Sequence, residues 1–188
     1  VAGTVVGLLV LGPAPDPGAL FNLDLVLTPE IPVPQGVWGL GPELPRRLPF
    51  MVPLAWASVL VDGAAAAPVV LVATFAVAFV GAQRLVGDRG VPTRLAAGLL
   101  YAAGPFLVTR VATGYLGVAL AAAALPWCLP HLLRPSASIA RTLLAAAALG
   151  ACGIGGGIFA LLAAGAGVIS DGPTRPVGRG AGAGLVGQ

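Results

Sequence analysis

Residues 64–83 read AAAAPVVLVATFAVAFVGAQ and contain no charged side chain. A helix that crosses a membrane needs about 20 consecutive, mainly apolar residues, and this stretch supplies them. The whole chain has the same character, because 57% of its residues are hydrophobic, 9% are charged and its mean hydropathy is +0.96. A soluble domain carries about 25% charged residues. The sequence therefore predicts an all-α fold, a polytopic transmembrane bundle of about four to five spans.

The other apolar stretches divide the chain into further membrane segments. Residues 1–12 are too short to span, so they form either the outer part of a first transmembrane helix or a short buried helix. We treat residues 1–188 as a single transmembrane domain and as a fragment of a longer protein. Its expected parts are a partial first span (1–12), a loop with an interfacial helix (13–62), membrane segments (64–83, 95–109, 111–133 and 142–169) and a flexible tail (170–188). The short segment at 95–109 is expected to be broken at Gly104-Pro105.

The loop at residues 13–62 is the long polar part of the chain. It is rich in proline and carries five acidic residues against two arginines. Residues 21–27 (FNLDLVL) alternate and then become apolar, which predicts either a short strand or an extended segment at the interface. Residues 50–61 (FMVPLAWASVLV) are too short to span and predict a helix that lies on the membrane surface or is re-entrant.

The distribution of charge predicts the orientation in the membrane. The connections at residues 84–94 and 131–141 are basic, so the positive-inside rule places them in the cytoplasm. Alternation of the spans then makes the loop at 13–62 extracytoplasmic, which agrees with its acidic character. We expect a multi-pass protein of the plasma membrane, with Arg110 on the outer side.

Several other functions are disfavoured by the residues. The net charge of +3 comes from arginines scattered between apolar spans, so nucleic-acid binding is not expected. Cys128 and Cys152 lie in apolar segments and are interpreted as small buried hydrophobes. His131 is interpreted as an interfacial residue. Residues 153–159 (GIGGGIF) follow no strand and do not predict a dinucleotide site. No cluster with metal-ligand spacing is present in the sequence, and no cofactor is expected.

Three parts of the chain resemble a known family. They are LDLVLTPEIPVPQGVWGLG with LPRRLPFMVPLAW (23–41 and 44–56), the VDG turn (61–63) and YAAGPFLVTRVATGYLGVALAAAALPW (101–127). Over about residues 10–135 the chain resembles the N-terminal part of actinobacterial GT-C-type polytopic membrane glycosyltransferases. The resemblance implies an enzyme that moves a sugar from a polyprenyl-phosphate donor to an acceptor of the cell envelope. Such proteins are far longer, which is why we expect a fragment.

The resemblance also implies an acidic residue in the first extracytoplasmic loop, and Asp24 is the best candidate. Transfer of a sugar to a hydroxyl needs a base that takes the proton of the acceptor, and a carboxylate at the membrane surface serves this purpose. Leu23 and Leu25 flank Asp24 and would partly desolvate it. The alternative is that Asp24 is the solvated member of an alternating strand.

Cations at the interface would bind the phosphate of the lipid donor. Arg46, Arg47 and Arg110 are the candidates, since a guanidinium binds phosphate through two hydrogen bonds. Glu43 is a second acidic candidate for the substrate site, although Arg46 lies three residues later and a local ion pair also explains it. Arg46 and Arg47 also suit a role as headgroup anchors. Arg110 either lines a polar cavity or extends to the interface.

Three functions remain as alternatives: a lipid-linked sugar transferase, a non-catalytic membrane scaffold or subunit, and part of a transporter. A transporter requires polar residues that face each other at mid-membrane, and the spans contain almost none. The expected partners are membrane lipid, a polyprenyl-phosphate-linked sugar, and further membrane segments or subunits.

Overall fold

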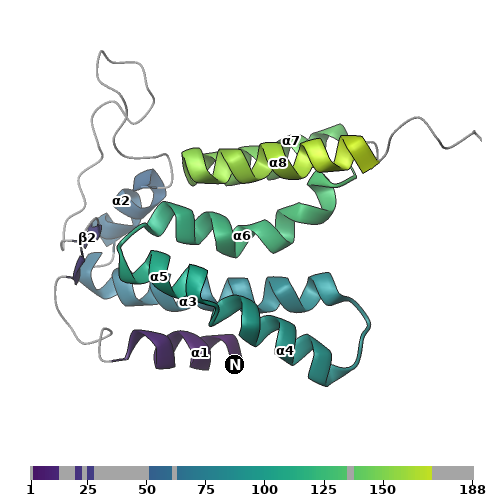
Figure 1. The fold of residues 1–188 in the computed structure, drawn as a ribbon. Helices are drawn as coiled ribbons and strands as arrows, with labels where there is room; N and C mark the ends of the chain where they lie inside the picture. Colours follow the sequence, from purple (N-terminus) through teal and green to yellow (C-terminus); the bar gives the residue numbers. More distant parts are fainter. Residues whose placement is uncertain are drawn as a thin grey trace, which may run out of the picture.

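The computed structural model describes residues 2–12, 20–22, 25–27, 51–60, 63–134 and 138–170. Within these residues the chain is helical apart from one short antiparallel hairpin (Figure 1). The elements in chain order are α1 (Ala2–Leu11), β1 (Leu20–Asn22), β2 (Leu25–Leu27), α2 (Met51–Leu60), α3 (Gly63–Val86), α4 (Val91–Ala102), α5 (Pro105–Ala112), α6 (Leu116–Leu132), α7 (Ile139–Ala151) and α8 (Ile154–Ser170). The predicted helical character of the chain is confirmed for this part.

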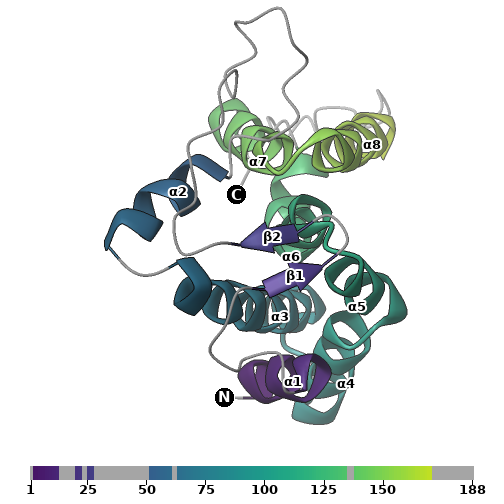
Figure 2. The same cartoon turned by 90° about the vertical axis from the view of Figure 1, so that its left-hand side faces the viewer.

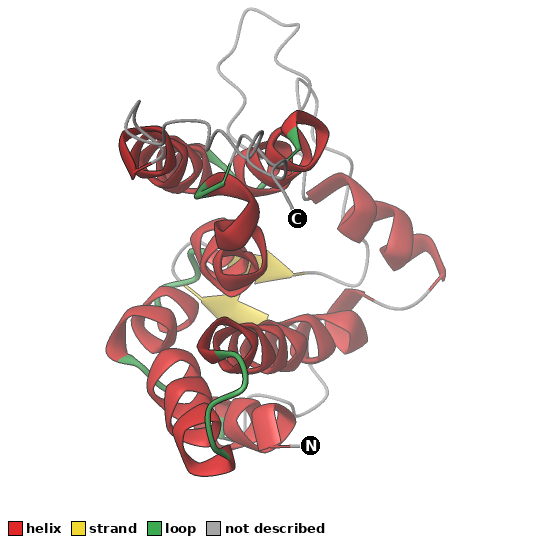
Figure 3. Cartoon of the chain, turned by 90° about the vertical axis from the view of Figure 1, so that its right-hand side faces the viewer, coloured by secondary structure: helices red, strands yellow, loops and turns green. Residues whose placement is uncertain are grey.

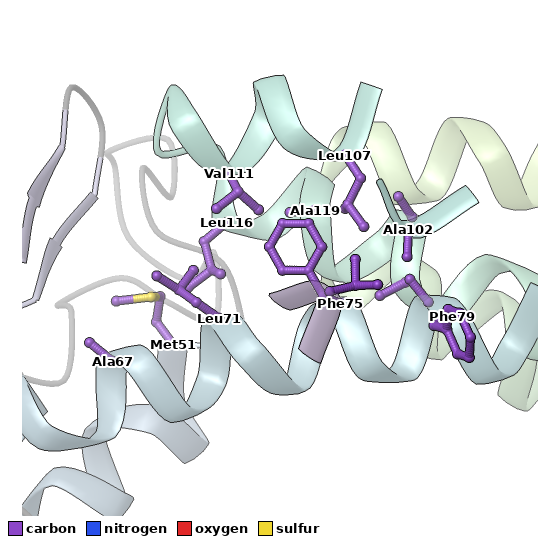
Figure 4. Packing of buried hydrophobic residues seen from close by; sticks show 14 of the residues in the cluster. Met51, Ala67, Leu71, Phe75, Phe79, Ala102, Leu107, Val111, Leu116 and Ala119 are labelled. Atoms are coloured by element: carbon purple, nitrogen blue, oxygen red, sulfur yellow. The ribbon is translucent and has the colours of Figure 1, made fainter. Parts of the chain in front are cut away.

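Helix α3 is the centre of the larger core. It contains the charge-free residues 64–83, which were predicted to form a helix long enough to cross a membrane. It packs against α1, α4 and α6. Phe75 is fully buried, and Leu71 and Phe79 extend the same buried stripe at helical spacing. Figure 4 shows these side chains directed towards residues of α4, α5 and α6. The buried residues of this core are Val6, Met51, Ala55, Ala67, Leu71, Phe75, Ala78, Phe79, Ala102, Leu107, Val111, Leu116, Ala119, Ala122 and Ala123.

Two glycines let α1 approach α3 closely. A Cβ atom at Gly3 would lie 2.9 Å from the Cα atom of Ala76, and one at Gly7 would lie 3.2 Å from the Cα atom of Val72. Helices in apolar surroundings associate through such small residues spaced four apart, because dispersion contacts grow as the backbones approach. The segment predicted at 1–12 is therefore a helix fitted against α3.

Helix α6 lies between two cores. One face contributes to the α3 core, whereas Ala121, Cys128 and Leu132 pack against α7 and α8. Its many alanines allow this burial on several faces, since they occupy little volume. The second core consists of Ala121, Cys128, Leu132, Ala145, Leu149, Ala160 and Ala163.

A tyrosine compensates for a proline inside α6. Pro126 has no N–H, so the carbonyl of Ala122 loses its usual helical hydrogen bond. The hydroxyl of Tyr101 donates to this carbonyl at 2.7 Å. The bond joins α4 to α6 and satisfies a polar group that would otherwise be unpaired in an apolar interior.

The break predicted at Gly104-Pro105 is confirmed. Helix α4 ends at Ala102, and α5 begins at Pro105, whose missing N–H is not needed at the first helical position. A Cβ at Gly104 would lie 2.6 Å from the carbonyl oxygen of Leu100, so the turn requires glycine. The predicted boundaries differ nearby, because α5 continues through Arg110 to Ala112. Arg110 thus belongs to a helix and not to a connection between two segments.

Residues 142–169, expected as one span, do not form a single continuous helix. Helices α7 and α8 pack against each other across a turn at Cys152 and Gly153. Gly153 has a φ of 120°, a conformation that L side chains rarely adopt. The axes of both helices run alongside α6 (Figure 1). The chain therefore reverses its direction at the glycine-rich stretch, and α7 and α8 form a helical hairpin.

The described parts of the 13–62 loop form a hairpin and α2. Residues 21–27 were expected as one strand or an extended segment, but β1 and β2 pair with each other, with Asn22 opposite Leu25. The helix predicted at 50–61 is present as α2. Pro53 is compatible with it, because the N–H groups of a first turn have no helical partner. Met51, Val52 and Ala55 of α2 are buried, whereas Trp56 is exposed.

The bundle has two distinct ends. In Figure 1 the turn between α3 and α4, the end of α6 and the start of α7 lie at one end, which we call the basic end. Figure 3 views this end directly. The opposite end, seen in Figure 2, carries the hairpin, α2 and the corner between α5 and α6. We call it the Arg110 end.

Two stretches of helix, Ala66–Val86 and Val91–Ala112, are long and apolar enough to cross a membrane. The second of these includes the break between α4 and α5. The surface is also apolar, since many large hydrophobic side chains are exposed. On α7 and α8 they are Ile139, Leu143, Leu144, Ile154, Ile158, Leu161, Leu162, Val168 and Ile169.

Candidate functional site

Of the five candidate site residues, the structure describes Arg110. Asp24, Glu43, Arg46 and Arg47 lie outside the described residues. The strands β1 and β2, which flank Asp24 in the sequence, lie at the same end of the bundle as the end of α5 (Figure 2). The roles of these four residues therefore stay predictions.

Arg110 lies close to two aromatic rings. Its guanidinium carbon is 5.4 Å from the centroid of the Phe106 ring and 5.7 Å from that of the Tyr115 ring. Phe106 precedes Arg110 by four residues and so lies on the same face of α5. A cation over an aromatic face is attracted by the ring quadrupole, by about 0.5–1 kcal/mol at exposed sites and more when desolvated. The half-buried Arg110 side chain is thus held in place by both rings.

The turn after α5 positions Tyr115. The N–H of Tyr115 donates to the carbonyl of Arg110 at 2.9 Å, and the N–H of Gly114 donates to that of Val111 at 3.0 Å. This pair of bonds defines a Schellman motif, which requires a left-handed residue that is usually glycine. Gly114 fulfils this requirement with a φ of 82°. The motif returns the chain towards Arg110, so the local sequence TRVATGY is sufficient to bring the Tyr115 ring beside the guanidinium.

The other ring is held by a distant helix. Phe106 contacts Phe159 of α8 edge to face, with ring centroids 6.4 Å apart. Aromatic pairs prefer this arrangement because the positive edge of one ring meets the negative face of the other. The Arg110 site therefore combines α5, the start of α6 and α8.

Arg110 is chemically suited to an anion. Among the described residues its side chain has no hydrogen bond and no ion pair, and it is the single charged side chain at the Arg110 end. A guanidinium packed against rings through its faces keeps its N–H groups at the edge, where a phosphate binds them in the plane. Phe106 and Tyr115 were not identified as site residues from the sequence. Two features of the sequence could have identified them: Phe106 lies four residues before Arg110, and a glycine, which favours a turn, follows α5 directly before Tyr115.

A second arginine is packed on an aromatic ring at the basic end. The guanidinium carbon of Arg84 lies 4.5 Å from the centroid of the Trp127 ring. The indole N–H of Trp127 donates to the carbonyl of Val77 at 3.0 Å, which joins α6 to α3. Gly81 makes room for the indole, since a Cβ there would lie 2.5 Å from Nε1 of Trp127. This arrangement was not predicted from the sequence.

The two cysteines and His131 lie on α6 and at the end of α7. Cys128 is buried in α6 and Cys152 lies at the end of α7, and both thiols are free. The hydroxyl of Thr142 donates to the carbonyl of His131 at 3.0 Å, which satisfies a group at the end of α6. His131 itself is exposed at the basic end. In the part of the chain that the structure describes, no three His, Cys, Asp or Glu side chains lie close enough to hold a metal ion.

Comparison of the chain with protein-family models, with curated proteins and with solved structures finds no match.

Proposed function

We propose that the chain is a multi-pass protein of the plasma membrane. The observation that carries this proposal is the surface of the bundle, where large apolar side chains are exposed along the helices. Charged side chains of the described residues are confined to turns and the terminal turns of helices. Lipid accepts such an apolar exterior, and water does not. Under the positive-inside rule the basic end faces the cytoplasm, and the Arg110 end with the hairpin and α2 faces outward.

Within this membrane domain we propose a GT-C-type sugar transfer at the Arg110 end. The support is the sequence resemblance together with a ring-packed arginine that has no acidic partner among the described residues. Arg110 would bind the phosphate of a polyprenyl-phosphate-linked sugar, with Arg46 and Arg47 beside it. Asp24 would take the proton from the acceptor hydroxyl, and Glu43 would contact the substrate. A non-catalytic scaffold is the alternative that the transfer assay must separate.

The buried interior gives little support to a transport path. Thr74 is the one buried polar side chain among the described residues, and its hydroxyl donates to the carbonyl of Val70 in its own helix at 2.7 Å. A transport path needs polar groups that face a substrate at mid-membrane. The described interior therefore does not favour the transporter alternative.

Labelling of single cysteines tests the orientation. In a background with Cys128→Ala and Cys152→Ala, we place one cysteine at Asp88 or at Thr113 and add a membrane-impermeant maleimide. Thr113→Cys should react in intact cells, and Asp88→Cys should react only after lysis. The reverse pattern would reject the proposed sidedness, and recovery of the chain in the soluble fraction after alkaline extraction would reject the membrane proposal.

Transfer of labelled sugar from a polyprenyl-phosphate donor in isolated membranes tests the chemistry. Arg110→Gln should weaken use of the donor, whereas Arg94→Gln, an exposed arginine at the basic end, serves as the matched control. Asp24→Asn should abolish transfer while donor binding persists. Transfer that survives Asp24→Asn would remove Asp24 from the mechanism. No transfer by the unmodified chain, with donor still bound, would favour the scaffold.

A further inference from the structure

The basic end carries a clear excess of positive charge. Its described residues include five arginines, Arg84, Arg89, Arg94, Arg134 and Arg141, against one acid, Asp88, and all six side chains are exposed. None of them forms an ion pair with another described residue. The end therefore has unneutralised cations directed outward from the bundle.

Arg84 differs from the other four arginines because it is packed on a ring. Trp127 holds the guanidinium over its face at 4.5 Å, and the indole is itself fixed by its bond to Val77. Packing restricts the rotamers of Arg84 before any ligand arrives, so less entropy is lost when an anion binds. An indole with one polar edge and an apolar body also suits the level of lipid headgroups.

The same face of α3 provides an apolar strip that leads to Arg84. Val80 and Val77 precede Arg84 by one and two turns, and each is 42% exposed. A ligand that fits both features has a phosphate at one end and an acyl chain at the other. A free phosphate would use the guanidinium and leave the valines uncovered.

We propose that Arg84, packed on Trp127, binds the phosphate of an anionic phospholipid whose acyl chain lies along Val80 and Val77. The site rests on the proposed membrane location, but not on the proposed sugar transfer, and it lies at the opposite end from Arg110. Anionic lipids bind basic pockets between helices on the cytoplasmic side of membrane proteins, where each arginine contributes to the attraction.

Quenching of Trp127 fluorescence tests the site. Trp38→Phe and Trp56→Phe leave Trp127 as the sole tryptophan of the full chain, which is studied in detergent micelles. Phosphatidylglycerol and phosphatidylcholine with the same brominated acyl chains are added in parallel. We expect phosphatidylglycerol to reach half-maximal quenching at about one fifth of the mole fraction that phosphatidylcholine needs, since one arginine near an anionic surface contributes about that factor. Equal half-points would overturn the proposal.

Two arginine variants separate a specific site from general attraction. Arg84→Gln should remove the preference for phosphatidylglycerol, and Arg94→Gln, which loses the same charge at the same end, should retain it. An equal loss in both variants would show general attraction only and would overturn the site. Arg84→Lys keeps the charge but not the planar guanidinium, so it covers the case in which Arg84→Gln fails to fold. It should weaken the preference, and an unchanged preference would overturn the role of the ring.

Inorganic phosphate separates the two sources of the anion. At matched ionic strength, phosphate in place of chloride should leave the quenching by brominated phosphatidylglycerol unchanged. Displacement of the lipid by millimolar phosphate would identify a free-phosphate site and overturn the lipid assignment. Equal lipid half-points together with the expected cysteine labelling would reject this site and leave the membrane proposal standing.

Discussion

Each end of the bundle holds an arginine against aromatic rings, but the two arrangements are built differently. At the Arg110 end, Phe106, Arg110 and Tyr115 come from one short stretch of sequence, and a helical repeat and a Schellman turn bring them together. At the basic end, Arg84 and Trp127 come from α3 and α6, which are distant in sequence. The first arrangement is encoded in one stretch of sequence, apart from the contact of Phe106 with Phe159 of α8. The second depends on how two helices pack.

The difference predicts which changes disturb which end. The Trp127 arrangement should fail whenever the contact between α3 and α6 is altered, even by a change that removes no charge. The Arg110 arrangement should tolerate such changes and respond to changes within its own turn. The four substitutions below test this contrast.

Gly81→Ala should have the largest effect. The added Cβ would lie 2.5 Å from Nε1 of Trp127, so the indole must move and its bond to Val77 is lost. Overpacking of this kind costs about 1–3 kcal/mol of stability. Thermal unfolding in detergent measures the loss of stability, and the fluorescence of Trp127 reports the movement of the indole. Gly165→Ala is the matched control, because a Cβ there meets nothing within 4 Å and alanine favours a helix. Equal melting temperatures for the two variants would contradict the assignment.

Gly114→Ala should disturb the other end. The left-handed φ of 82° costs an alanine about 1–2 kcal/mol. The chain would relieve this strain by opening the Schellman turn, which separates Tyr115 from Arg110. Gly87→Ala imposes similar strain at φ 69° at the basic end and serves as the control. The Nε–Hε resonance of Arg110 should shift in Gly114→Ala and not in Gly87→Ala. A shift of similar size in both would show that the two ends are not independent.

Tyr101→Phe tests a further contact between helices that are distant in sequence, the bond that joins α4 to α6. It leaves the carbonyl of Ala122 unpaired and should cost about 1 kcal/mol. Pro126→Ala restores an N–H that can bond to this carbonyl, so Tyr101→Phe should be nearly neutral in that background. Thermal unfolding of the two single variants and the double variant gives the coupling. Additive effects would mean that Tyr101 does not compensate for the proline.

Tyr115→Leu should have the smallest effect. It removes one of the two rings at Arg110 and should cost about 0.5 kcal/mol, the lower range for an exposed cation–π contact. Phe106→Leu should cost more, because it also removes the contact with Phe159. Thermal unfolding of both variants in the same detergent compares them. A greater loss in Tyr115→Leu would reverse the assigned roles of the two rings.

Local features of the fold were predictable from the sequence, because they depend on single residues. The charge-free stretch within α3, the break at Gly104-Pro105 and the helix now seen as α2 followed from hydropathy and from proline. The turn at Gly153 was harder to predict from the sequence. A glycine-rich apolar stretch permits either close packing or a reversal, and the choice depends on whether α7 and α8 both find a surface on α6.

Only part of the candidate site could be predicted from the sequence. Arg110 was identified by its charge in an apolar region. Its ring partners could have been inferred from their spacing, whereas the contact of Arg84 with Trp127 could not. That contact requires the register of α3 against α6, which Gly81 and the bond between Trp127 and Val77 help to set. No periodicity within one segment contains this information.

Under the proposed membrane location, the reversal at Gly153 has a consequence for the side on which α8 ends. Helix α8 returns to where α6 finishes, since a Cβ at Gly167 would lie 2.6 Å from the carbonyl oxygen of Leu132. Helix α7, with 13 residues, is about 20 Å long, which is less than the thickness of a bilayer core of about 30 Å. In the proposed membrane protein, Ile139 and Ser170 would lie on the same side, whether the pair crosses fully or only enters the lipid part of the way. A reporter fused after Ser170 would therefore share a compartment with the turn at Asp88, where a single span over 142–169 would have placed it across the membrane.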